Sequence, residues 1–182
     1  DTTDTGEGDA CTTESDLTLP QLLANVEHII VLCMENRSFD HYFGARKLIE
    51  GQSDVDGLVG GEFNLDQQGN AIETFHLTNY EPDDPPHGWD AVHAQWNGGA
   101  NDGFVIEHQK THGDAVKHEV MGYHVREDLP VHYALADEYA LCDRYFCSLL
   151  GPTWPNRFHL HCGTSDGKTT NTPPLLGPKT IQ

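Results

Sequence analysis

Basic residues are scarce in this sequence of 182 residues. Ten Lys and Arg stand against 29 Asp and Glu, which gives a net charge of −19 with His neutral. A surface this acidic repels phosphate backbones, and no basic stretch offsets it, so we expect no nucleic-acid partner. The balance is typical of salt-adapted proteins and also of acidic secreted proteins, and the composition favours neither.

Long apolar runs are also missing. None approaches the roughly 20 residues that a membrane-spanning helix requires, so we expect a water-soluble chain without a transmembrane segment. Residues 1–16 have neither the basic nor the apolar region of a signal peptide. They predict a disordered acidic leader over residues 1–25. Removal of a signal peptide leaves such a leader exposed, so we expect a secreted, periplasmic or cell-surface location.

Cysteines are few, and the five present form no C-x-x-C pair, which argues against a zinc ribbon or a thioredoxin motif. Their odd number leaves at least one thiol unpaired within the chain. Cys33 lies in an apolar run and is expected to be a small core residue. Cys142 and Cys147 could form a disulfide in an exported protein, and the sequence leaves this open.

The first ordered pattern is the apolar run of residues 26–34, VEHIIVLCM. It is rich in β-branched residues and too short for a typical helix. It therefore predicts a strand buried on both faces, as in a parallel sheet covered by helices. A polar turn follows, and Ser38 is expected to cap a short helix that runs through Phe43 and stops at Gly44.

Residues 45–125 are rich in Gly, Asp, Asn, Pro and His and predict a long excursion with short helices. Helical periodicity returns over residues 129–141, with Asp128 as the cap and Pro130 in the first turn. The apolar positions expected on the buried face of this helix are Val131, Leu135, Tyr139 and Leu141.

A second unit of strand, turn and helix follows. Residues 144–150 suit another buried strand, Gly151 and Pro152 break it, and a helix is expected to start at Pro155, after Thr153. Two such units predict an α/β fold.

Polar side chains follow both predicted strands. In open α/β sheets ligands bind beyond the carboxyl ends of the strands, so Glu35, Asn36 and Thr153 would meet in one crevice if the strands are parallel neighbours. A carboxylate, an amide oxygen and a hydroxyl suit a divalent cation. Thr153 would also lie at a helix N-terminus, which attracts anions, and a bound metal would activate it as a nucleophile. Taken alone, each residue also fits a simpler role as a cap or a solvated turn.

The segment of residues 27–44 resembles the opening signature of a bacterial phosphoesterase family; it reads EHIIVLCMENRSFDHYFG. This family contains non-haemolytic phospholipases C and an acid phosphatase. Three later blocks are similar to the same family, in the same order: PPHGWDAVHAQWNGGANDGF, DLPVHYALADEYALCDRYFCSLLGPTWPNRFHLHCGT and the final KTIQ. The resemblance implies an alkaline-phosphatase-like three-layer α/β/α core with a mostly parallel sheet. It also implies a bound divalent metal ion and hydrolysis of phosphate esters through a covalent phospho-enzyme.

The resemblance also implies roles for matching positions. The metal ligands fall on Glu35 and Asn36, and the nucleophile, itself close to the metal, falls on Thr153. A histidine near the phosphate falls on His87 in PPHGW, with His93 as the second choice. A threonine nucleophile is closer to the phospholipase C branch of the family than to its acid phosphatase branch.

Part of the family's site has no counterpart here. Its remaining metal ligands, two adjacent aspartates, and further histidines lie downstream of the matching region. The resemblance therefore implies that residues 26–182 are the N-terminal part of a catalytic domain, inactive alone. Asp83 and Asp84 are adjacent, but they precede the nucleophile in a Pro-rich loop, and we expect them to be solvated.

We therefore expect a metal-dependent, phospholipase C-like hydrolase that acts on a phospholipid or another small phosphate ester through a phospho-threonine. One alternative is an acid phosphatase of the same family. Another is a non-catalytic acidic module that binds metal through some of the twelve histidines. The candidates for that role are His108 and His112, spaced i, i+4, with His118, His124 and His132 beyond. A G-x-S-x-G match over residues 163–167 lacks the preceding strand that a nucleophile elbow requires.

Overall fold

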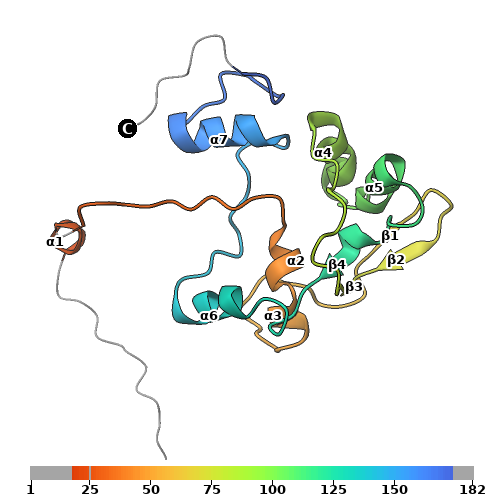
Figure 1. The fold of residues 1–182 in the computed structure, drawn as a ribbon, viewed down its shortest axis with the longest axis horizontal. Helices are drawn as coiled ribbons and strands as arrows, with labels where there is room; N and C mark the ends of the chain where they lie inside the picture. Colours follow the sequence, from red (N-terminus) through yellow and green to blue (C-terminus); the bar gives the residue numbers. More distant parts are fainter. Residues whose placement is uncertain (1–17, 25, 174–182) are drawn as a thin grey trace, which may run out of the picture. The chain divides into compact units, whose positions relative to one another are not determined.

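The computed structural model describes residues 18–24 and 26–173 (Figure 1). The chain divides into two units, residues 1–35 and 36–182. In the first, helix α1 (Leu19–Leu23) begins after Thr18, whose backbone N–H donates to Oε1 of Gln21 at 2.8 Å. Residues 1–17 of the predicted acidic leader lie outside the described residues.

The apolar run of residues 26–34 is not a buried strand. It has no strand pairing (Figure 1), Ile30 is 91% exposed, and Cys33 is exposed rather than in a core. An apolar sequence favours burial, but a strand exists only where its backbone N–H and C=O groups find a partner strand. In the described part of the chain, the two sheets are formed by other segments, and residues 26–34 pair with none of their strands.

The second predicted strand, residues 144–150, is also wrong for this structure. These residues form bends and irregular backbone, and Phe146 is 78% exposed. Cys142 and Cys147 are exposed free thiols, so the disulfide that the sequence left open is not formed here.

Two small sheets are present in the described residues. Strands β1 (Phe63–Leu65) and β2 (Ala71–Glu73) pair antiparallel, and β3 (Phe75–His76) pairs parallel with β4 (Gly122–Tyr123). Together with the helices they make the described part of the chain α/β.

Helix α2 (Phe39–Phe43) confirms the predicted cap, because Oγ of Ser38 accepts a hydrogen bond from the backbone N–H of His41 at 3.2 Å. This bond satisfies one of the free donors at the helix start. The entry to α2 is therefore fixed by local sequence alone.

Gly44 has a different role from the predicted helix stop. Its φ is −56°, which is right-handed, and helix α3 (Ala45–Leu48) follows at once. A Cβ at Gly44 would lie 2.7 Å from Cγ of Leu58, so the glycine permits close packing. The core cluster forms beside it, from Ala45, Leu58 and Tyr123.

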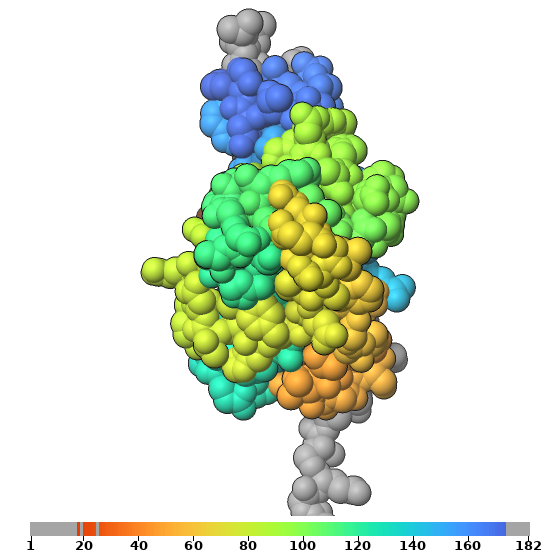
Figure 2. Space-filling view, turned by 90° about the vertical axis from the view of Figure 1, so that its right-hand side faces the viewer, coloured from red at the N-terminus to blue at the C-terminus, as the bar shows by residue number. Residues whose placement is uncertain are grey.

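The predicted excursion with short helices is confirmed. It contains α4 (Trp89–Trp96), the 3₁₀ turn η1 (Asn97–Gly99), α5 (Phe104–His112) and the 3₁₀ turn η2 (Glu119–Met121). Figure 2 shows the β1–β2 hairpin beside α5. Buried Asn64 joins them, since its Oδ1 accepts from the backbone N–H of Phe104 and its Nδ2 donates to the carbonyl of Asn101.

Helix α6 (Pro130–Glu138) has Pro130 in its first turn, as predicted. Its N-cap is Leu129 rather than Asp128. The carboxylate of Asp128 instead accepts from the backbone N–H of Val125 and from Nε2 of His76, at 2.9 and 2.7 Å. Asp128 therefore ties the turn before α6 to strand β3.

The buried face of α6 is not the predicted one. Val131, Leu135 and Tyr139 are exposed, whereas Tyr133 is fully buried. The guanidinium carbons of Arg46 and Arg126 lie 5.6 and 4.9 Å from the centre of its ring. The buried face of α6 thus includes Tyr133 with its cation–π contacts, which the pattern of apolar residues does not predict.

Helix α7 (Thr153–Cys162) begins two residues earlier than predicted, with Pro152 as the N-cap. Gly163 ends it in the left-handed conformation with φ of 71°. Residues 163–167 thus follow a helix, which is not the setting of a nucleophile elbow. Within the ranges described, no helix is both long enough and apolar enough to cross a membrane.

Candidate functional site

A cavity of about 800 Å³ lies within residues 36–123. Residues from three segments, 36–41, the Pro-rich loop 82–87 and 119–123, line it together with polar residues of other segments, such as Glu62, Asn64 and Gln95. Its volume suits a small organic ligand with a few fixed polar contacts. Asn36 and His87, two of the predicted site residues, both line it.

Asn36 occupies the left-handed region of backbone space, with φ of 80°. Asn adopts this conformation more readily than most residues, so it suits the sharp turn before α2. Its side-chain Nδ2 donates to Oδ1 of Asp84, and its backbone carbonyl accepts from Nη1 of Arg37. The amide nitrogen is therefore engaged, and the amide oxygen is the atom available to a cation.

His87 is oriented by its own loop. Its Nδ1 lies 2.9 Å from the carbonyl oxygen of Pro85 and 3.7 Å from Oδ1 of Asp84. A carbonyl only accepts hydrogen bonds, so Nδ1 carries the proton. Nε2 is therefore the ring atom that can take or give a proton in a reaction.

Asp83 and Asp84 are exposed to solvent, as the sequence predicted, and Asp84 makes contacts as well. Its side chain is 58% exposed, but its carboxylate contacts both Asn36 and His87. The one sequence signal is its place three residues before His87 in DPPH. The contact with Asn36 joins positions 48 residues apart, which no local pattern reveals.

His41 also lines the cavity and was not singled out from the sequence. Its Nδ1 donates to the carbonyl oxygen of Gly122 at 2.7 Å. Burial lowers the pKa of His41 to about 4; the bond to Gly122 opposes this, while His124 and Arg37 lower the pKa further. The ring is therefore neutral near pH 7.

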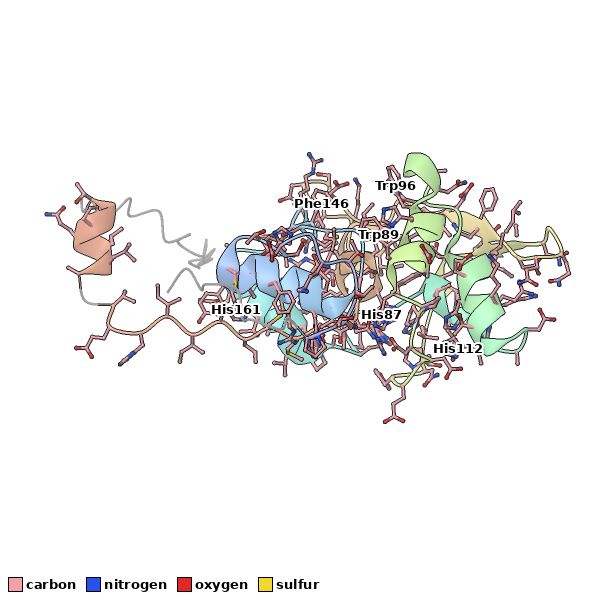
Figure 3. All side chains as sticks on the ribbon, turned by 90° about the horizontal axis from the view of Figure 1, so that it is seen from above. His87, Trp89, Trp96, His112, Phe146 and His161 are labelled. Atoms are coloured by element: carbon pink, nitrogen blue, oxygen red, sulfur yellow. The ribbon has the colours of Figure 1, made fainter. Side chains whose placement is uncertain are left out.

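Thr153 is the first residue of α7 and is half-buried, but it does not line the cavity. Asn156 holds the turn before it: Oδ1 accepts from the backbone N–H of Leu149, and Nδ2 lies within 3.2 Å of the carbonyls of Leu149, Gly151 and Pro152. The same turn packs close to the start of α4, because a Cβ at Gly151 would lie 3.4 Å from Cε3 of Trp89. Figure 3 labels Trp89 and His87, which are two residues apart in the chain.

Glu35 and His93 are not among the residues that line this cavity. Glu35 is the exposed last residue of the first unit. His93 stays on α4, where its Nδ1 donates to the carbonyl of Trp89 at 2.7 Å and its ring lies 4.2 Å from the Trp89 ring. Of the two candidate histidines, His87 is thus the one that lines the cavity.

The side-chain amide oxygen of Asn36 is a type of ligand that divalent cations bind, and the hydrogen bond of this amide to Asp84 uses Nδ2 and not the oxygen. Among residues 18–24 and 26–173, no three His, Cys, Asp or Glu side chains are grouped so that they could hold a metal ion. The predicted pair of His108 and His112 has ring centres 4.6 Å apart, and His108 is fully buried.

Residues 26–181 match the Phosphoesterase family. The chain is 36% identical over 181 residues to phospholipase C B of Mycobacterium tuberculosis, covering 90% of this chain and 34% of that protein. It is 34% identical over 167 residues to a non-hemolytic phospholipase C of Burkholderia pseudomallei, covering 85% and 23%. It is also 34% identical over 158 residues to non-specific phospholipase C1 of Arabidopsis thaliana, covering 80% and 29%.

The chain thus spans about a third or less of the length of these relatives. The resemblance carried by its four sequence blocks is confirmed. The chain belongs to the phosphoesterase family.

Proposed function

We propose that the complete protein hydrolyses phosphodiesters of the phospholipid type, with Thr153 as the nucleophile and His87 as the acid. The observation that carries the proposal is the cavity shared by Asn36 and His87, in a chain of the phosphoesterase family. Relatives named phospholipase C support a phospholipid substrate.

The oxygen ligands Glu35, Asn36 and Thr153 would hold a divalent metal ion. When bound, such an ion neutralises charge on the phosphoryl oxygens and lowers the pKa of a hydroxyl close to it. The free amide oxygen of Asn36 supports this role.

The protein side chains carry the covalent and proton-transfer steps. Oγ1 of Thr153 loses its proton to solvent, attacks phosphorus in line and forms a P–O bond, while the bond from phosphorus to the alcohol breaks. Nε2 of protonated His87 gives its proton to the departing alcohol. The same nitrogen then takes a proton from water, whose oxygen attacks the phospho-threonine and releases phosphate ester and free Thr153. Oγ1 recovers a proton from solvent when Thr153 is released at the end of the cycle.

We also propose that residues 26–34 and 144–150 become strands of a three-layer α/β/α core with a mostly parallel sheet in the complete protein. The exposure of Ile30 and Phe146 supports this, because soluble proteins rarely leave apolar runs open to solvent. We propose a secreted or cell-surface location as well, which the acidic composition supports.

Thr153→Val tests the proposal directly. Because Thr153 is the first helical residue and not the cap, the substitution should cost no more than about 0.7 kcal/mol of stability. Loss of a nucleophile instead removes orders of magnitude in turnover. We expect Thr153→Val to abolish hydrolysis of p-nitrophenyl phosphorylcholine and Thr153→Ser to keep part of it.

Two results would count against this proposal. Turnover by Thr153→Val near the wild-type rate would remove Thr153 from the chemistry. Wild-type preference for p-nitrophenyl phosphate over the diester would instead favour the acid phosphatase alternative. Melting temperatures of both variants serve as the folding control.

A further inference from the structure

An asparagine that binds a metal must present its oxygen and not its nitrogen. The two ends of the amide have nearly the same shape, so packing alone does not select one. A neighbouring acceptor does select one, because only the NH₂ end can donate to it. The structure supplies such an acceptor in Asp84, whose Oδ1 takes a hydrogen bond from Nδ2 of Asn36.

We infer that Asp84 is a positioning residue that holds the amide of Asn36 with its oxygen toward the metal ion. This inference rests on the proposed function, since it needs Asn36 as a ligand. Neither the family match nor the sequence patterns assign this role to Asp84.

The loop that carries Asp84 is held firmly. Three successive carbonyls, of residues 84–86, accept hydrogen bonds from ring nitrogens of His112 and His87 and from the amide of Gln95, at 2.7, 2.9 and 2.7 Å respectively. Two of these residues are prolines, whose φ is fixed by the ring. The carboxylate is thus presented by a rigid backbone.

A second tie fixes the start of the same loop. The carboxylate of Glu119, which is buried, accepts from Nδ2 of Asn79 at 2.9 Å and from the backbone N–H of Asp83 at 2.8 Å. Both oxygens of Glu119 are used within the protein. The loop that carries Asp84 is therefore held by residues of α4, α5 and η2.

The same oxygen of Asp84 lies 3.7 Å from Nδ1 of His87. One carboxylate thus stands between the candidate ligand and the candidate acid. A partner of this kind fixes the orientation of a metal ligand, and its removal typically weakens metal binding about 10–100-fold. The contact with Asn36 is therefore open to measurement without turnover.

The experiment uses the complete natural protein, freed of metal with a chelator and titrated with Mn²⁺ alone, with free Mn²⁺ followed by electron paramagnetic resonance. We expect Asp84→Ala to weaken Mn²⁺ binding about 10–100-fold. Asp84→Asn keeps an oxygen that accepts from Asn36 and should stay within about threefold of wild type. Glu81→Ala removes an exposed carboxylate of the same loop and should bind as wild type does.

The double variant Asn36→Ala, Asp84→Ala separates positioning from general electrostatics. If Asp84 acts through Asn36, the double variant binds Mn²⁺ as weakly as Asn36→Ala alone. The inference is overturned, and the metal site is left intact, by either of two results. In one, the losses of Mn²⁺ affinity in the two single variants multiply in the double variant. In the other, Asp84→Asn and Asp84→Ala lose the same affinity. Unchanged binding in Asn36→Ala would overturn both the inference and the proposed metal site.

Discussion

The ring of His41, on helix α2, is kept neutral by burial and is hydrogen-bonded to Gly122 of strand β4. Burial is the largest cause of its lowered pKa, and the neighbouring ring of His124, 4.7 Å away, adds to it. The bond from Nδ1 to the carbonyl of Gly122 fixes the tautomer. The side chain thus contributes a stability that depends on pH.

We expect acid to destabilise the protein partly through His41. Its folded pKa of about 4 lies below the ordinary 6.5, so the unfolded chain binds the proton more readily. Stability is therefore fully present above pH 6.5 and falls as the pH drops toward 4. The slope from this residue is at most about 1.4 kcal/mol per pH unit, and less because solvent reaches part of the ring.

Urea unfolding at pH 7, 5.5 and 4.5 measures this slope. His41→Asn keeps a donor for the carbonyl of Gly122 but has no proton to bind, so its stability should vary less with pH. His124, whose pKa burial also lowers, accounts for part of the remaining slope. Identical slopes in wild type and His41→Asn would refute the assignment.

Among single residues, the sequence singled out Asn36 and His87, which both line the cavity, because each lies in a short motif with a recognisable pattern. It did not predict Asp84 or His41 as site residues. Their importance comes from contacts with residues 48 and 81 positions away, and sequence spacing carries no sign of these.

Helix α7 depends on one side chain at its start. Asn156 bonds back to the turn of residues 149–152 with both ends of its amide, so it sets the direction in which Thr153 enters the helix. The backbone N–H of Trp154 is satisfied separately by Oδ1 of Asn171. The position of Thr153 thus rests on a few hydrogen bonds from nearby residues.

Asn156→Asp should loosen this turn. A carboxylate still accepts from Leu149 but donates nothing to the three carbonyls, so we expect a loss of about 1–3 kcal/mol in chemical denaturation. Turnover should fall as well, because Thr153 is no longer held. Asn171→Ala removes a single accepted bond and should cost less; an equal or greater cost would contradict the role given to Asn156.

Helices α2, α6 and α7 could be predicted because their signals, Ser38, Pro130 and the Gly-Pro break at residues 151–152, are local. The predicted strands at residues 26–34 and 144–150 could not be confirmed in the same way. A strand depends on partners distant in sequence, and an apolar run gives only its tendency to be buried. The short strands that do form, such as β3, are set by contacts with distant segments.

For the whole molecule, the negative charge is balanced only locally. In the described part of the chain, five basic residues form ion pairs with carboxylates, such as Arg126 with Glu50 at 2.8 Å and Lys117 with Asp66 at 2.8 Å. These pairs join segments far apart in the sequence, since Arg126 lies 76 residues from Glu50 and Lys117 lies 51 residues from Asp66. The net charge gives only the expectation that nucleic acid is not a partner, and the motifs, not the charge, identified the family.

The most direct test of the account is to trap the covalent intermediate. The complete protein is mixed with a phosphodiester substrate, quenched in acid during turnover, digested and analysed by mass spectrometry. We predict a phosphate ester on Thr153, in the peptide that contains GPTWPNR, and none in Thr153→Val. A phosphate on a different residue, or a Thr153→Val enzyme that turns over at the wild-type rate, would contradict the mechanism.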